Sequence, residues 1–300
     1  MIEQDVLRRF IFEDIGVRGT WVNLTQSWQA AKLHQKGPEI AQLQLGQALA
    51  AVVMLSSTIK FKGSMILQAQ GDGDLKALVA KSTDNQKIRG LLRSEQHVPT
   101  GTLEDQFGLG RLVLTIEPDE GNPYQGVVPL QGKNLAAAVQ TYFEQSEQLN
   151  TRLWLFANET SAAGLLIQEL PAQNGEFDDW QRIELFANTI TEQEALTLEC
   201  EELLYKLFNE EHLRLFDAEP VAFQCSCSKH RIERTLRAMG REELESILLE
   251  FGHIEVDCEF CNEHYNFDCV DVETLLSQEA LLNNSETQHG NCQCSCRLDG

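Results

Sequence analysis

The sequence predicts an α+β protein built in successive parts. Three observations lead to this prediction: strand-like runs are grouped with helices between them, an acidic helical stretch follows, and all nine cysteines lie at or beyond residue 200. The expected parts are an N-terminal mixed α/β core domain at 1–185, an acidic amphipathic helical linker at 186–222, a small C-terminal four-cysteine zinc-binding domain at 223–276 and a disordered tail with further cysteines at 277–300.

Composition and charge narrow the class of protein. Hydrophobic residues make up 42 % of the 300 residues, and 46 acidic against 24 basic residues give a net charge of −22. That balance argues against a nucleic-acid partner, because phosphate contacts need clustered Lys and Arg. The N-terminus lacks a secretory pattern, and the apolar run 45–59 is shorter than the ~18 residues of a membrane span. We therefore expect a cytoplasmic protein with reduced thiols and no membrane partner.

The expected core follows a readable order of elements. "GPEIAQLQLGQALAAVVMLSSTIK" predicts a buried helix after a Gly-Pro breaker, and "NLAAAVQTYFEQSEQL" predicts an amphipathic helix. Strand-like runs lie at 63–70, 74–81, 86–93, 110–118 and 124–132, and 151–158 with 162–171 predict a hairpin. "GDGD" at 71–74 predicts a tight turn in which glycine supplies a positive φ. His34 and His97 are isolated and no nucleotide loop occurs, so we expect no enzyme.

The stretch from 176 to 222 changes in character. It is acidic and helical in pattern, and Leu196, Leu203, Leu204, Leu207 and Phe208 fall on one stripe. Thr191 with Glu194 predicts a capping box at a helix start. Two interpretations stay open: an ordinary helical hairpin packed on the core, or a detachable linker that covers an apolar surface.

Four cysteines have the spacing of a metal site. Cys225 and Cys227 form C-x-C, and Cys258 and Cys261 form C-x-x-C after thirty intervening residues. Two close pairs around a small folded insert predict one tetrahedral Zn²⁺ with S–Zn distances near ~2.3 Å. The insert predicts a helix capped by Ser228 and ending at Gly240, a second helix ending near Gly252, a strand–knuckle–strand unit, and a last helix capped by Asp271.

The C-x-C pair also predicts redox sensitivity. Two thiolates this close can be joined by oxidation with little chain movement, and Lys229, His230, Arg231 and Arg234 favour the thiolate form. A structural zinc contributes ~10–16 kcal/mol to folding, whereas a small domain has ~5–15 kcal/mol in total. Oxidation should therefore unfold the zinc unit, and the acidic linker beside it could follow.

At this point the sequence resembles a known family. "FQCSCSKHRIERTLRAMGREELESILLEFGHIEVDCEFCNEHYNFD" resembles the redox switch of the 33 kDa chaperonin family, the oxidation-activated heat-shock holdases of bacteria. "QAQGDGDLKALVA", "YQGVVPLQGKNLAAAVQTYFEQSEQLNTRLWL" and "LFNEEHLRLFDAEPV" resemble the family's core and linker, so the resemblance covers about residues 5–276.

The resemblance implies a function and its residues. Cys225, Cys227, Cys258 and Cys261 match the zinc thiolates of a reduced, inactive form, and oxidants convert them to the disulfides Cys225–Cys227 and Cys258–Cys261 with loss of zinc. The oxidised protein then forms a homodimer and holds unfolding client proteins without ATP. We expect dimerisation through the core domain, and client contact at apolar surface on the core and linker, near Leu203, Leu204, Leu207 and Phe208.

Five cysteines depart from the family pattern: Cys200, Cys269, Cys292, Cys294 and Cys296. The last three form C-x-C-x-C in the tail, either as incidental thiols or as a second metal or redox cluster. Two other functions remain: a zinc-finger-like nucleic-acid module based on the basic run 229–241, and a disulfide reductase using "CEFC". The acidic charge counts against the first, and a strand after "CEFC" where a reductase has a long helix counts against the second.

Overall fold

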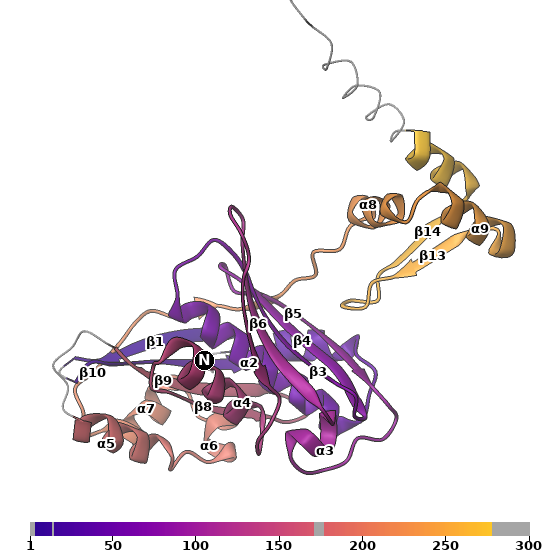
Figure 1. Cartoon of the computed structure of the whole chain (residues 1–300). Coiled ribbons are helices and arrows are strands. Elements are labelled where there is room, and N and C mark those ends of the chain that lie inside the picture. The colour runs from indigo at the N-terminus through magenta and orange to yellow at the C-terminus, as the bar shows by residue number, and fades with distance from the viewer. Residues whose placement is uncertain (1–3, 14, 171–176, 278–300) are drawn as a thin grey trace, which may run out of the picture. The chain divides into compact units, whose positions relative to one another are not determined.

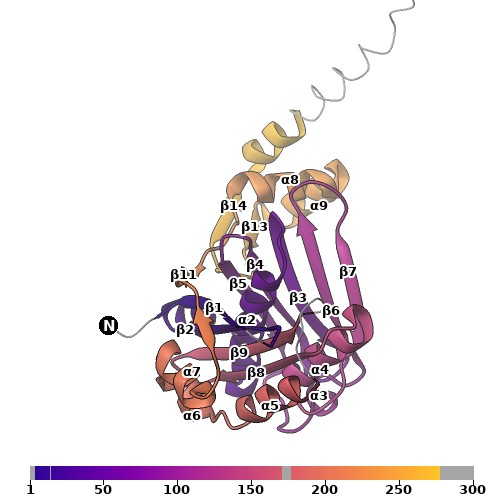
Figure 2. The ribbon, with the colours of Figure 1, turned by 90° about the vertical axis from the view of Figure 1, so that its left-hand side faces the viewer.

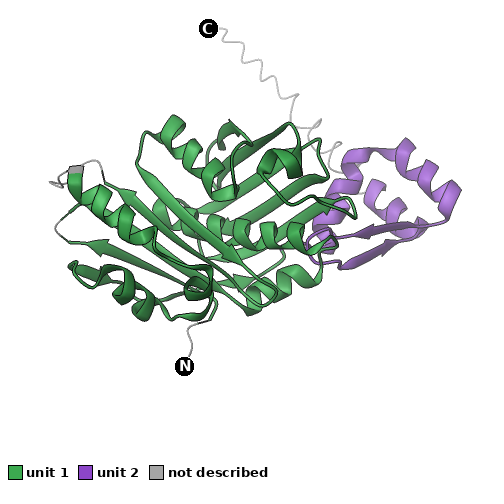
Figure 3. Ribbon diagram, turned by 90° about the horizontal axis from the view of Figure 1, so that it is seen from below, with its two compact units in different colours: residues 1–225 green, residues 226–300 purple. Residues whose placement is uncertain are grey.

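The computed structural model describes residues 4–13, 15–170 and 177–277. The chain separates into two compact units, unit 1 at 1–225 and unit 2 at 226–300 (Figure 3). The predicted core domain and predicted linker thus lie together in unit 1, and the division falls between Cys225 and Ser226, inside the C-x-C motif.

The first sheet of unit 1 has the order β10-β1-β2-β9-β8, with β11 also paired to β1, and its pairings are antiparallel. Its strands are β1 (Val6–Phe12), β2 (Val17–Leu24), β8 (Thr151–Ala157), β9 (Ala162–Glu169), β10 (Leu213–Leu215) and β11 (Glu219–Pro220). The hairpin predicted at 151–171 is confirmed by the register of β8 on β9, which matches Leu153 with Leu166.

The second sheet has the order β12-β5-β4-β3-β6-β7 (Figure 1). Its strands are β3 (Gly63–Gly71), β4 (Leu75–Thr83), β5 (Lys87–Ser94), β6 (Gly110–Pro118), β7 (Tyr124–Pro129) and β12 (Ala222–Phe223). Adjacent strands are antiparallel except β12, which runs parallel to β5. All five predicted strand runs between 63 and 132 are confirmed.

Helix α2 (Glu39–Thr58) contacts strands of both sheets, and its apolar residues fill the main core. It begins after Pro38, as the Gly-Pro breaker predicted. It is long and apolar enough to cross a membrane, but 67 % of its most apolar window is buried, which is typical of a core helix. Shorter helices complete this part: α1 (Gln26–Leu33), α3 (Leu103–Phe107), α4 (Leu135–Tyr142) and the π-helix η1 (Phe143–Glu147).

The predicted "GDGD" turn joins β3 to β4, but the predicted reason for its glycines is wrong. Neither Gly71 nor Gly73 has a positive φ. A Cβ on Gly71 would lie 2.0 Å from the carbonyl oxygen of Phe107. A Cβ on Gly73 would lie 2.4 Å from the carbonyl carbon of Phe107. The glycines are required because the end of α3 approaches the turn, where the Gly73 N–H donates to the Phe107 oxygen at 2.7 Å.

Three helices from the acidic stretch cover one face of the first sheet (Figure 2). They are α5 (Phe177–Ala187), α6 (Glu192–Thr197) and α7 (Cys200–Phe208). The predicted capping box is confirmed at α6, where the Glu194 N–H donates to Thr191 Oγ1 and the Thr191 N–H donates to Glu194 Oε2. The chain is helical as far as Phe208. From Leu213 onward it is extended and forms β10, β11 and β12 in succession.

Unit 2 contains α8 (Lys229–Met239), α9 (Arg241–Phe251), the hairpin of β13 (Ile254–Asp257) with β14 (His264–Phe267), and a helix over 269–277. Ser228 Oγ accepts the Arg231 N–H, and Gly240 and Gly252 follow the two helices with φ of 88° and 79°, all as predicted. The predicted cap at Asp271 is wrong. Asp268 Oδ1 accepts the N–H groups of Val270 and Asp271, so the last helix begins three residues earlier.

Candidate metal and redox centre

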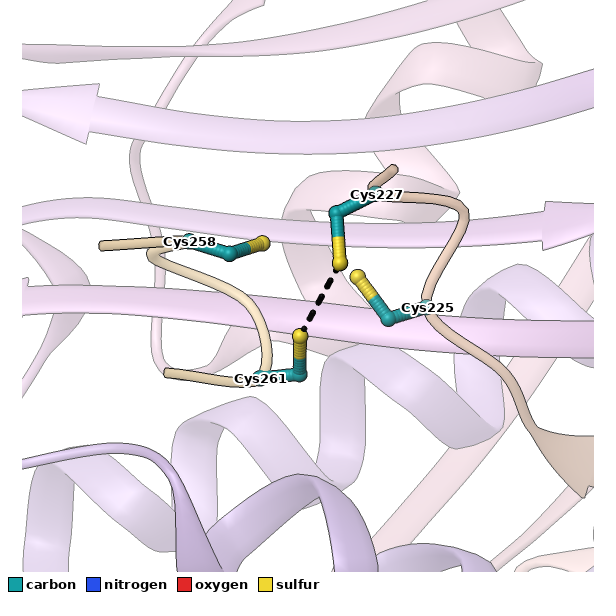
Figure 4. A group of neighbouring side chains, drawn as sticks. All are labelled: Cys225, Cys227, Cys258 and Cys261. Atoms are coloured by element: carbon teal, nitrogen blue, oxygen red, sulfur yellow. Dashed lines mark hydrogen bonds between the residues drawn. The ribbon is translucent and has the colours of Figure 1, made fainter. Parts of the chain in front are cut away.

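Four cysteine sulfurs converge at one point. Cys225 and Cys227 lie in the extended segment between β12 and α8, and Cys258 and Cys261 lie in the turn between β13 and β14. Their four Sγ atoms all lie within 4.8 Å of one another (Figure 4). Cys227 Sγ lies 3.3 Å from Cys261 Sγ. The structure thus brings together the four residues that the spacing predicted.

The turn between β13 and β14 places two of the thiols. The Cys258 carbonyl accepts the N–H groups of Cys261 at 3.3 Å and Asn262 at 2.7 Å, and the Cys258 N–H donates to Glu263 at 3.0 Å. Asn262 has a φ of 53°, a left-handed conformation that Asn tolerates better than most residues. The tight turn therefore presents both sulfurs on one side.

The C-x-C segment is fixed by the start of α8. Arg231 Nη1 donates to Ser226 at its carbonyl oxygen (3.2 Å) and at its Oγ (2.7 Å). Because Ser226 lies between Cys225 and Cys227, these bonds hold the backbone that carries both thiols. Arg231 was predicted only as a charge that favours the thiolate; its geometry adds a positioning role.

The donor set fits a tetrahedral metal ion. Bonds of ~2.3 Å in a tetrahedral site with four sulfurs separate neighbouring sulfurs by about 3.8 Å. The observed sulfurs, with one pair at 3.3 Å and all within 4.8 Å, need only small side-chain adjustments to reach that spacing. Four thiolates are soft ligands, which suit Zn²⁺ and not Mg²⁺ or Ca²⁺.

The groups around the sulfurs are polar and paired. The pKa of the Tyr265 phenol is raised, mainly by a hydrogen bond with Cys227 and secondly by burial. Lys229 forms an ion pair with Asp271 at 3.3 Å. His264 contacts the carboxylate of Asp257, the residue before Cys258, at 2.8 Å, and His253, at the far end of β13 from the cysteines, contacts the carboxylate of Glu255 at 3.0 Å. Tyr265 was missed from the sequence, because it is 38 positions from Cys227 and only the folded chain brings the two together.

The remaining predicted residues lie elsewhere. Cys269 is exposed at the start of the last helix, and Cys200 is buried at the start of α7. Cys292, Cys294 and Cys296 lie outside the described residues. The predicted client-contact residues Leu203, Leu204, Leu207 and Phe208 are 0 %, 3 %, 7 % and 3 % exposed, in a cluster that also holds Phe10 and Phe12. A client can reach them only if α7 moves away from the first sheet.

A two-sheet α+β unit, a small unit after it and four converging cysteines define the class of protein: one whose thiols could together hold a metal ion. The model of the family described as "Hsp33 protein" matches residues 5–268. The chain therefore belongs to the Hsp33 family.

Relatives and a solved structure agree with this assignment. The chain is 56 % identical to the 33 kDa chaperonin of Nitrosococcus oceani, covering 96 % of this chain and 100 % of that protein. It is 39 % identical to the 33 kDa chaperonin of Methylobacillus flagellatus, covering 95 % and 99 %. The crystal structure of the 33 kDa chaperonin (heat shock protein 33 homolog) from Thermotoga maritima has a TM-score of 0.79, 21 % identity, and coverage of 92 % and 99 %. That last likeness shows the fold; with the family and the relatives, the chain is a chaperone and not a member of an enzyme family.

Proposed function

We propose that this chaperone is an ATP-independent holdase switched by oxidation: inactive when reduced with one Zn²⁺ bound, and active when its cysteines form disulfides. The observation that carries the proposal is the convergence of two sequence-close cysteine pairs within 4.8 Å. In each pair the second cysteine lies two or three positions along the chain from the first. Each pair can therefore be oxidised to a disulfide without a long chain movement. The convergence of the four sulfurs provides a metal site. The short spacing within each pair provides a way to lose the metal, because disulfide formation removes its thiolate ligands.

The chemistry at the four sulfurs is a two-electron oxidation of each pair. Bound Zn²⁺ would hold the four sulfurs as thiolates and add its binding free energy to folding. With hydrogen peroxide as oxidant, the thiolates of Cys225 and Cys227 lose two electrons and one S–S bond forms. The peroxide O–O bond breaks, and its two oxygens leave as two waters after taking up two protons from solvent. Cys258 and Cys261 react in the same way. Disulfide sulfurs no longer serve as thiolate ligands.

The consequence for the fold follows from the size of the core of unit 2. Among its described residues, one buried apolar cluster is formed by Leu236, Leu244, Ile254, Phe267, Val272, Leu275 and Leu276. So small a core depends on a metal for stability. We propose that unit 2 unfolds on oxidation, that α7 loosens, and that Leu203, Leu204, Leu207 and Phe208 then contact unfolding clients. The oxidised form acts as a homodimer in the cytoplasm, with no nucleic-acid or membrane partner.

The test measures metal content and free thiols before and after peroxide, with light scattering of an unfolding client in parallel. We expect metal loss, the loss of four thiols at 225, 227, 258 and 261, and suppression of client aggregation to occur together. Cys227→Ser should lose the metal even when reduced. Cys269→Ser, at an exposed cysteine outside the four, is the matched control and should switch normally. Complete metal loss without protection of the client would refute the proposal.

The two other functions have less support. The basic residues of the 229–241 run are largely paired with carboxylates, as in Lys229–Asp271, Arg237–Glu233 and Arg241–Glu245, which leaves little charge for phosphates. Cys258 and Cys261 lie in a turn between two strands. A thiol there lacks the helix N-terminus that lowers the pKa of a reductase cysteine.

A further inference from the structure

One continuous segment, residues 212–224, covers an edge of each sheet in unit 1; we name it the strap. Its first part pairs antiparallel with β1 through β10 and β11, and its last part pairs parallel with β5 through β12. The strap ends one residue before Cys225. The same chain that leads to the cysteine centre therefore occupies two sheet edges.

The strap runs along the whole outer edge of β1. The Glu13 N–H donates to the His212 oxygen at 3.0 Å, and the Phe216 N–H donates to the Arg9 oxygen at 2.9 Å. Further along, the Val221 N–H donates to the Asp5 oxygen at 2.7 Å. The register also places residue 11 opposite 214 and residue 7 opposite 219. The odd-numbered positions from 5 to 13 therefore all face the strap with their backbone polar groups.

The pairing of the strap with β5 is shorter than its pairing with β1. The Ala222 N–H donates to the Gln86 oxygen at 3.1 Å and the Gln224 N–H donates to the Ile88 oxygen at 2.9 Å. Further along the same strand, the Leu92 N–H donates to the buried side chain of Gln35 at 2.8 Å. The part of this edge next to Cys225 thus depends on a strap pairing only two residues long, so it is the part that releases first when the cysteine end is freed.

The strap also shows which side chains the β1 edge accepts. Leu213 and Leu215 pack against the cluster that contains Phe10 and Phe12, while Arg214 between them is exposed. Phe12 meets Phe208 of α7 edge to face at 5.1 Å. When α7 and the strap leave together, a backbone edge and an apolar surface beside it open at the same time.

Resting on the proposed function, we infer that the active protein binds clients by strand addition: the freed edges of β1 and β5 accept extended client segments with apolar residues at alternate positions. An uncovered edge strand is a template for pairing with another chain, and backbone hydrogen bonds give affinity with little demand on sequence. Unfolded proteins supply such segments. The strap occupies in the resting state the place that a client strand takes in the active state.

The probe is a fluorescent peptide with the strap sequence, HLRLFDAEPVAFQ, added to the full-length protein and followed by anisotropy. We expect binding at least about tenfold tighter to peroxide-oxidised than to reduced protein, and competition with an unfolding client. N-methylation at Phe216, whose N–H donates to Arg9, should weaken binding about tenfold. N-methylation at Leu215, whose N–H points away from β1 in this register, is the matched control and should keep most of the affinity.

Each outcome decides between the ideas. Client protection without peptide binding, or equal losses for the two N-methylated peptides, would overturn strand addition and leave the redox-switched holdase standing. Peptide binding with the Phe216 selectivity but without client protection would support the edge site and refute the holdase. If the peptide dissolves the oxidised dimer and leaves client protection intact, the edges bind a second copy of this chain and the client inference is overturned.

Discussion

Thr191 and Glu194 show what single side chains decide here. They exchange two hydrogen bonds at the start of α6, and Glu194 also pairs with Lys206 of α7. The hydrogen bond from Lys206, with those from Thr191, lowers the pKa of Glu194 from 4.5 to about 2. One carboxylate thus both starts α6 and connects it to the helix that carries the predicted client-contact residues.

This pKa sets an acid sensitivity that can be measured. Because the folded pKa lies below the unfolded value, the stabilisation is complete above pH 4.5 and is lost as pH falls toward 2. The hydrogen-exchange protection factor of the Glu194 amide should fall over that window. In Glu194→Gln it should be lower from the start and flat, whereas Glu192→Gln, in the same turn but outside the capping box, should keep the wild-type profile. An unchanged profile in Glu194→Gln would show that other carboxylates govern this helix end.

At the scale of elements, α7 is a cover held by its apolar stripe. Leu203 is 0 % exposed on the face that packs against the first sheet, while Tyr205, on the opposite side of the same helix, is 74 % exposed. Its first turn contributes Glu201, which pairs with Arg8 of β1 at 3.2 Å. Most of its attachment is therefore burial of apolar surface, which a truncation can weaken without touching the cysteines.

Leu203→Ala should loosen α7 selectively. Removing a buried leucine side chain costs about 2–5 kcal/mol, so the amides of α7 should exchange faster in the reduced protein and the free energy of unfolding of unit 1 should fall. Tyr205→Ala is the matched control and should stay within about 0.5 kcal/mol of wild type. Denaturant titration with hydrogen exchange measures both. Equal effects of the two substitutions would mean that α7 is not held by this stripe.

For the whole molecule, buried apolar core is divided unequally between the two units. Unit 1 has the long α2 between two sheets and two apolar clusters, whereas the cluster of unit 2 is small. The two units should therefore respond differently to loss of a metal. Loss of a metal would act at the cysteine centre, because its four possible ligands come from two separate stretches of chain that the metal would link.

Chelation of the reduced protein should unfold unit 2 and spare the centre of unit 1. We expect amide protection to disappear in α8, α9, β13 and β14 while β2, β3 and β4 stay protected, since structural zinc supplies about 10–16 kcal/mol of folding free energy. Hydrogen exchange before and after chelation measures this, and added Zn²⁺ should restore the protection. Persistent protection of unit 2 in metal-free protein would contradict a metal-dependent fold.

Local sequence chemistry predicted most elements well. Helix caps and helix ends depend on residues within a few positions of one another, so they can be predicted without knowing the fold. This holds for the caps at Thr191 and Ser228 and for the ends at Gly240 and Gly252. The Asp271 cap failed because Asp268 offers the same chemistry three residues earlier. The glycines of "GDGD" were explained by the wrong effect because their neighbour, the Phe107 backbone, is distant in sequence.

The sequence by itself determined the four cysteines, their two pairs, and the helices and strands around them, because spacing, periodicity and caps act within one stretch of chain. Only the tertiary structure decided where 212–224 lies, what covers Leu203 and Phe208, and that Tyr265 meets Cys227. Those depend on strand register and on packing between segments far apart in the chain, which no local pattern specifies.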